Sequence, residues 1–124
     1  MPTALQVPAN VTLTIRQGST FAHRFRVLND DDTAADLTGY TARMQVRVSK
    51  NATAFMLELT TTNGRLMVDG PNGAVTLSLT SVDTAAINKG GRYDLEIVLD
   101  QGTSPEFVSR IAEGKLVLSK EVTK

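Results

Sequence analysis

A chain of 124 residues with 41% hydrophobic and 21% charged residues has the composition of one globular domain. The 13 basic and 13 acidic residues cancel to a formal net charge of zero, which argues against nucleic-acid binding through bulk charge. The lack of cysteine excludes disulfides and thiolate sites, the single histidine excludes a histidine-rich metal site, and no apolar run approaches the roughly 20 residues of a membrane helix.

Two prolines, Pro2 and Pro8, lie within the first nine residues and favour extended backbone. We therefore predict an extended N-terminal arm over residues 1–9 and a single domain over residues 10–124. The arm is a candidate for strand exchange with a neighbouring protein or for lying along its surface.

Apolar and polar residues alternate through the first half of the chain, which is typical of strands with one buried face. The alternating segments are residues 11–16, 21–27, 40–48 and 55–60. Thr and Val are abundant, and their branched Cβ atoms favour strands. Three consecutive acids at residues 30–32 lie in a predicted turn.

Turn residues follow in quick succession. Asn63-Gly64 predicts a tight hairpin, because both residues tolerate positive φ. Residues 69–73 predict a second, longer turn. Short strands are expected between these turns at residues 66–68 and after them at residues 75–79.

One short helix is expected near residues 81–88. Thr80 places a hydroxyl three residues before the carboxylate of Asp83, which resembles a capping box. Gly90 and Gly91 end the helical segment.

The last third returns to strands. Residues 92–99 alternate, residues 100–102 predict a turn, and residues 107–112 and 116–122 predict a pair of strands joined around residues 113–114. The whole pattern gives about seven to nine short strands and one short helix, so we predict an all-β fold, an antiparallel β-sandwich of immunoglobulin-like or jelly-roll-like type. A small closed barrel is the alternative.

Few residues are candidates for chemistry. His23 alternates in phase with Phe21 and Phe25, so we expect a histidine at the edge of the core with one hydrogen bond rather than a catalytic base. The acids at residues 30–32, with Asp36 nearby, are expected to form a solvated turn, because consecutive carboxylates diverge instead of converging on a calcium ion. We predict no catalytic residue, no metal site and no cofactor.

Four arginines are candidates for contact with a partner. Arg24, Arg26, Arg43 and Arg47 point away from the apolar residues of two consecutive strands. If these strands pair, the arginines form a basic stripe that suits phosphate or an acidic protein surface. A solvated sheet face is the alternative.

A carbohydrate-binding module or small hydrolase is the main rival from another functional class. The scattered acids Glu58, Asp94, Glu96, Glu106 and Glu113 form no recognisable glycosidase pair. Sugar-binding modules usually present exposed Trp or Tyr, whereas this chain has no Trp, and its two tyrosines, Tyr40 and Tyr93, lie in phase with core residues.

Several segments together resemble a family of small bacteriophage virion proteins. The segment at residues 36–47 resembles the family motif D-L-T-G-Y/A followed by R seven residues later, and it is the most recognisable of them. Residues 16–21, 73–80, 91–96 and 114–118 resemble further family segments, and the likeness extends over residues 16–123. The same pattern occurs in the N-terminal domain of phage upper baseplate proteins and in stand-alone phage structural proteins.

The resemblance implies a non-enzymatic structural protein of the virion, assembled in the cytoplasm of the bacterial host. It implies partners among other virion proteins, either the major capsid protein or tail and baseplate proteins. From the neutral charge and the lack of a long apolar run we expect neither nucleic acid nor membrane as a partner. Because the chain ends at Lys124 without the further domains of a baseplate protein, we expect a capsid decoration (cement) protein, with a tail, baseplate or connector module as the alternative. We also expect a homo-oligomer, with a trimer as the first guess.

Overall fold

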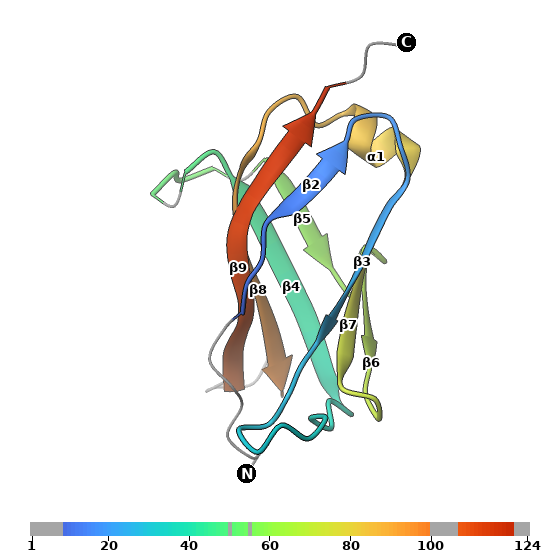
Figure 1. Ribbon diagram of the computed structural model, residues 1–124, viewed down its shortest axis with the longest axis vertical. Coiled ribbons are helices and arrows are strands. Elements are labelled where there is room, and N and C mark those ends of the chain that lie inside the picture. Colours follow the sequence, from blue (N-terminus) through green and yellow to red (C-terminus); the bar gives the residue numbers. More distant parts are fainter. Residues whose placement is uncertain (1–8, 50, 55, 100–106, 121–124) are drawn as a thin grey trace.

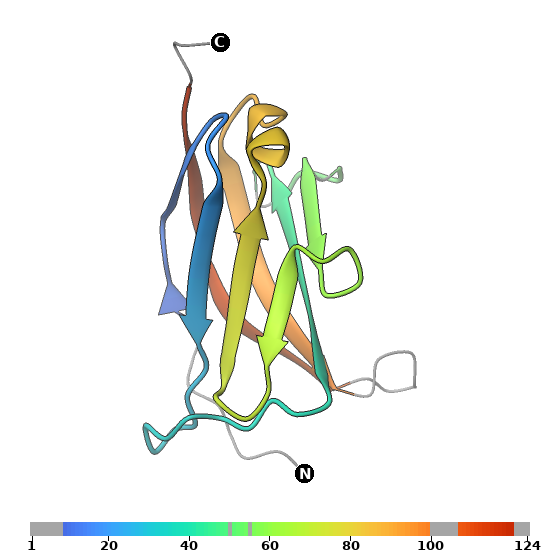
Figure 2. The same cartoon turned by 90° about the vertical axis from the view of Figure 1, so that its right-hand side faces the viewer.

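Two β-sheets pack face to face in the computed structural model, which describes residues 9–49, 51–54, 56–99 and 107–120 (Figures 1 and 2). The larger sheet contains, in spatial order, β1 (Ala9–Asn10) and β2 (Leu13–Arg16) beside β9 (Phe107–Ser119), then β8 (Gly91–Leu99), β4 (Tyr40–Arg47) and β5 (Leu57–Thr60). The smaller sheet contains β3 (Phe21–Arg26), β7 (Ala74–Leu79) and β6 (Leu66–Asp69). Helix α1 (Ser81–Ala85) lies at one end of the sandwich (Figure 1). The predicted all-β sandwich is therefore confirmed.

The strand order is that of an immunoglobulin variable-type domain. The order β9-β8-β4-β5 matches the G-F-C-C′ sheet of such domains, and β3-β7-β6 matches the B-E-D sheet. All pairs are antiparallel except β1 and β2, which run parallel to β9. The structure therefore selects the immunoglobulin-like alternative over the jelly roll, and two separate sheets replace the closed barrel.

The core lies between the two sheets and is built by the predicted alternation. Ile15, Leu59, Val75, Leu95 and Ile97 are completely buried, and most of their neighbours along each strand are partly or fully exposed. Each fully buried aliphatic side chain stabilises the fold by about 1.5–3 kcal/mol. Val46 and Leu77 belong to the same cluster, so both sheets contribute to it.

The arm prediction falls largely on residues 1–8, which lie outside the described residues. Ala9, which the prediction places in the arm, pairs with Ala112 as part of β1. The turn predicted at residues 100–102 and the position of Phe55 also lie outside the described residues.

The last strand differs from the sequence prediction. Residues 107–119 form one continuous strand, β9, rather than two strands joined at residues 113–114. A β-bulge explains the misleading pattern: Leu95 pairs with Ala112 and Glu96 pairs with Arg110, so Ile111 is an extra residue and the alternation changes phase there.

Gly114 lets the N-terminal segment approach β9 closely. Its φ of +156° is rarely adopted by other residues, and a Cβ atom built there would lie 2.3 Å from the carbonyl oxygen of Val11. The amide of Val11 donates to the carbonyl of Glu113 at 2.9 Å. A glycine is therefore required where the segment between β1 and β2 runs along β9.

The hairpin predicted at Asn63-Gly64 is also wrong. This turn carries the chain from β5 in the larger sheet to β6 in the smaller sheet. The side-chain nitrogen of Asn63 donates to the backbone carbonyl of Glu58 at 3.0 Å, and its side-chain oxygen accepts from the backbone amide of Thr60 at 3.0 Å. The turn thus caps backbone groups of β5 instead of pairing two strands of one sheet.

The capping box is present as predicted, although the helix ends at Ala85 rather than near residue 88. The Thr80 hydroxyl accepts from the Asp83 amide at 3.1 Å, and the Asp83 carboxylate accepts from the Thr80 amide at 3.0 Å.

The hydrogen bond from the Thr80 amide and the neighbouring Arg65 guanidinium lower the pKa of Asp83. The stabilisation from Asp83 is therefore present above its unfolded pKa of 3.8 and is lost as the pH falls through the lower folded pKa.

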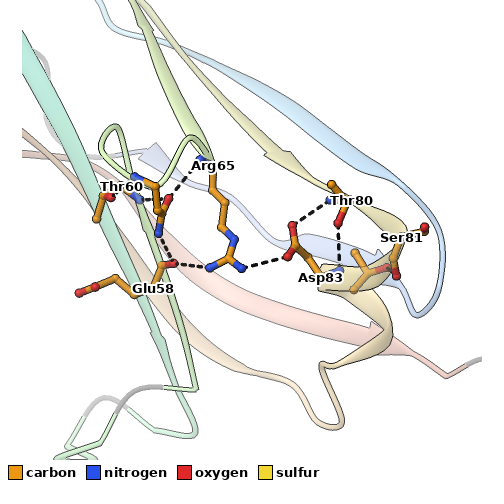
Figure 3. A network of polar contacts seen from close by, with 8 residues as sticks. Glu58, Thr60, Arg65, Thr80, Ser81 and Asp83 are labelled. Carbon is orange, nitrogen blue, oxygen red and sulfur yellow. Dashed lines mark hydrogen bonds and ion pairs between the residues drawn. The ribbon is translucent and has the colours of Figure 1, made fainter.

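Arg65 connects this helix cap to the larger sheet (Figure 3). Its guanidinium donates to the Asp83 carboxylate at 2.9 Å and to the Glu58 carbonyl at 3.1 Å. The side chains of Arg65 and Asp83 are 34% and 18% exposed, so the pair is largely shielded from water. One side chain thus joins α1, the start of β6 and the edge strand β5, and we call this arrangement the Arg65 clamp.

Replacing Arg65 tests the clamp. We expect Arg65→Ala to lower the free energy of unfolding by about 1–2 kcal/mol, because it removes charge-assisted hydrogen bonds to two partners. Urea unfolding followed by circular dichroism measures the change. Arg24→Ala is the matched control, because Arg24 forms an exposed 3.4 Å pair with Asp69 and its removal should change little. Equal effects of the two substitutions would contradict the clamp.

Tyr93 ties the N-terminal segment to β8 within the larger sheet. Its ring is 5% exposed, and its hydroxyl donates to the Val11 carbonyl at 2.6 Å. Burial, with a smaller contribution from the negative charge of Glu113, raises the pKa of Tyr93 to about 12. Its stabilising contribution is therefore complete below the unfolded value of 10.0 and is lost as the pH rises through about 12.

We expect Tyr93→Phe to destabilise the protein by about 1 kcal/mol at neutral pH, because the hydrogen bond to Val11 is lost. The difference from the wild type should narrow above pH 10, since only the wild type has this ionising group. Urea unfolding at pH 7 and at several values up to pH 12 measures both effects. A difference that stays constant across this range would contradict the assignment.

Candidate protein-binding surface

The outward face of the larger sheet carries most of the charge of the strands. Across β5, β4, β8 and β9 it presents five basic and four acidic side chains: Arg43, Arg47, Arg92, Arg110 and Lys115, and Glu58, Asp94, Glu96 and Glu113. Two depressions of about 290 and 720 Å³ lie on this face and share Gln45, Asp94 and Glu96 in their linings. The face is therefore broad and polar, with two adjoining depressions.

Strand register arranges these charges in rows across the sheet. Arg47 pairs with Arg92, and Arg92 pairs with Lys115, so three cations from β4, β8 and β9 lie side by side. We call these three residues the cationic row. Arg47 donates to the backbone carbonyls of Ala52 and Thr53 at 3.0 and 2.6 Å. These carbonyls carry no net charge, so they do not neutralise the guanidinium.

No carboxylate among the described residues forms an ion pair with the cationic row. Like charges directly opposite one another destabilise a sheet. The row therefore opposes folding locally.

The adjacent row is acidic. Register places Glu58 opposite Gln45, Gln45 opposite Asp94 and Asp94 opposite Glu113, and we call the three carboxylates the acidic row. Gln45 donates to Glu58 at 3.0 Å, and Arg110 lies 3.8 Å from Asp94 and 3.4 Å from Glu113. Beyond this row Arg43 pairs with Glu96 at 2.9 Å.

The four arginines predicted as one basic stripe do not lie together. Arg24 and Arg26 belong to β3 in the smaller sheet, and Arg43 and Arg47 belong to β4 in the larger sheet, so their strands do not pair and the stripe is absent. Whether each arginine contacts a partner stays a prediction.

Sequence reasoning missed Arg92 and Lys115. The alternation of residues 92–99 places Arg92 outward, and that signal was readable. Lys115 lies opposite Arg92 only because of the bulge at Ile111, which the alternation does not reveal.

His23 is half-buried, and its ring meets that of Phe25 edge-on at a centroid distance of 4.5 Å. Within the described residues no hydrogen bond of its imidazole is present, so the expected single hydrogen bond is not found there. The structure places it at the edge of the core, as predicted.

The acidic turn uses its carboxylates locally. Asp31 accepts from the amide and hydroxyl of Thr33 at 3.1 and 2.5 Å, and Asp36 accepts from the amide and hydroxyl of Thr38 at 3.0 and 2.7 Å. Hydrogen bonds from the hydroxyl and amide of Thr33 lower the pKa of Asp31. Those from the hydroxyl and amide of Thr38 lower the pKa of Asp36 in the same way. These contacts are those of the predicted solvated turn.

Among the described residues, no group of three or more His, Cys, Asp or Glu side chains is placed to hold a metal ion. No helix in the described part of the chain is long and apolar enough to cross a membrane. Of the five scattered acids, four lie on the charged face, and Glu106 lies outside the described residues.

Solved structures share this architecture. A chain from "Structural basis of T cell specificity and activation by the bacterial superantigen toxic shock syndrome toxin-1" is 13% identical, with a TM-score of 0.54 over 94% of this chain and 100% of that one. A chain from "Marsupial T cell receptor" is 10% identical, with a TM-score of 0.54 over 100% of this chain and 37% of that one. At these identities the likeness concerns the fold alone. No curated protein sequence matches the chain.

Fold and surface thus define an immunoglobulin-like β-sandwich with a charged outer face. The family model of the LtfC-like β-sandwich domain matches residues 7–119. The chain belongs to this family, and it is a phage-associated β-sandwich domain. The phage resemblance noted in the sequence is confirmed at this level.

Neutralising one member of the cationic row should stabilise the free protein. We expect Arg92→Gln to raise the free energy of unfolding by about 0.5 kcal/mol at low salt, because it removes repulsion from both cross-strand neighbours. The gain should shrink in 1 M salt, where charges are screened within about 3 Å. Arg24→Gln, on the other sheet beside Asp69, is the control and should give no gain. A destabilised Arg92→Gln variant would show that the row is not repulsive.

Proposed function

We propose that this protein is a non-enzymatic structural domain of a phage virion that works by binding other virion proteins. The observation that carries the proposal is the match of residues 7–119 to a phage-associated β-sandwich family. The charged outer face supports it, because the depressions on it are lined mainly by polar and charged side chains, whereas pockets for small ligands are lined mainly by apolar ones.

Within the virion we propose a position on the tail. The protein that gives the family its name is a phage-related tail fibre protein. The expectation of capsid decoration came from the lack of the further domains of a baseplate protein, and nothing in the described part of the chain adds to it. The two positions differ in the partner, which is a tail or baseplate protein in the first and the major capsid protein in the second.

The carbohydrate-binding alternative has less support. Tyr93 is buried and donates its hydroxyl to Val11, while the Tyr40 ring packs against the core. Neither tyrosine offers a flat exposed ring for stacking on a sugar, and the sequence has no Trp. Protein contact is therefore the better explanation of the outer face.

Immunogold labelling of purified phage particles tests this function and its location. We expect gold at the tail, with none when the antibody is first absorbed with the purified protein. Gold spread over the heads would replace the tail position with capsid decoration. Particles that carry no gold, and whose disrupted proteins contain no peptide of this chain by mass spectrometry, would overturn the virion role.

A further inference from the structure

The cationic and acidic rows are neighbours on one face. Successive outward residues of a strand are separated by two residues, or about 6.8 Å, so the rows run side by side across β4, β8 and β9. On β4, β8 and β9 the cationic row presents Arg47, Arg92 and Lys115, and the next row presents Gln45, Asp94 and Glu113, with Glu58 extending the acidic row onto β5.

This arrangement is complementary to itself. A two-fold axis that lies in the plane of contact, parallel to the rows and midway between them, places Arg92 and Lys115 of one copy on Asp94 and Glu113 of the other, and Arg47 on Gln45. The same rotation places Asp94 and Glu113 of the first copy on Arg92 and Lys115 of the second, because the two copies of an isologous interface exchange the same contacts. We propose that the outer face of the larger sheet binds a second copy of this chain through these two reciprocal row contacts.

A second copy fits the charges better than a partner of one sign. An acidic partner would satisfy Arg47, Arg92 and Lys115, but it would oppose Asp94 and Glu113 directly beside them. A copy of the same face adds Arg92 and Lys115 of the other chain to Asp94 and Glu113, which share Arg110 as an ion-pair partner within the chain, and it relieves the repulsion within the cationic row. Each face carries five basic and four acidic side chains, so its net charge is small and two such faces repel each other little.

Exposed apolar side chains flank the charges. Val108 and Val117 lie on the same outward side of β9, at either end of the charged segment, and are 40% and 44% exposed. They supply apolar contact area on either side of the charged rows along β9. The contact makes a dimer rather than the trimer expected from the sequence, and it depends on salt because its charges are accessible to solvent.

Charge reversal in matched pairs tests this interface. Variant A carries Arg92→Glu and Lys115→Glu, and variant B carries Asp94→Lys and Glu113→Lys. Each variant alone places like charges on like charges, whereas a mixture restores opposite charges at both contacts. Arg24→Glu with Arg26→Glu on the smaller sheet is the control, and circular dichroism verifies that each variant is folded. The neutral pair Arg92→Gln and Lys115→Gln covers the case in which a charge-reversed variant fails to fold.

Sedimentation velocity at up to about 1 mM protein gives the readout. We expect the wild type and the control to form dimers that dissociate as salt is raised. Variants A and B alone should bind themselves at least about tenfold more weakly, the neutral pair should be intermediate, and the mixture of A and B should form a one-to-one heterodimer.

A wild type that stays monomeric at every concentration and salt level would overturn the proposal. Undiminished self-association of variant A, or a mixture no more associated than its components, would also overturn it and assign the association to another surface. Presence in the virion is a separate measurement, so the failure of this interface leaves the immunogold result unaffected.

Discussion

The Arg65 clamp is the interaction on which one end of the sandwich depends. A two-sheet fold without a disulfide needs polar contacts at its open ends, where the apolar core stops. Arg65 reaches the Glu58 carbonyl at the edge of the larger sheet and the Asp83 carboxylate in the helix cap. Asp83 in turn holds the Thr80 amide, so the connection from β7 through α1 to β8 is attached to both sheets.

The charged face follows from this framework and from one irregularity in it. With β4 and β8 fixed in the larger sheet, register alone places Arg47 opposite Arg92 and Gln45 opposite Asp94. Arg110 and Lys115 lie on opposite sides of the bulge at Ile111. Because the bulge shifts the alternation by one residue, both side chains face outward. A surface for partners therefore arises from backbone geometry, and the exposed like charges are tolerated because the buried core supplies the stability.

Strands with one buried face were predictable because alternation is a local property of the chain. Residues 40–47 and 91–99 form strands where the pattern placed them, and the Thr80–Asp83 capping box forms because its atoms are only three residues apart. The errors arose where a local signal had two meanings. Asn63-Gly64 turns the chain between sheets rather than within one, and the phase change near Ile111 resembles a break between two strands.

The sequence by itself determined the class of fold, the single short helix and the phage-associated family, since each depends on residues close together in the chain or on a pattern spread along its length. Only the tertiary structure decided which strands share a sheet. That choice separated Arg24 and Arg26 from Arg43 and Arg47, and it brought Arg47, Arg92 and Lys115 together. The reason is physical: the alternation states which side of a strand is buried, whereas the neighbour of each strand is set by contacts between residues far apart in sequence.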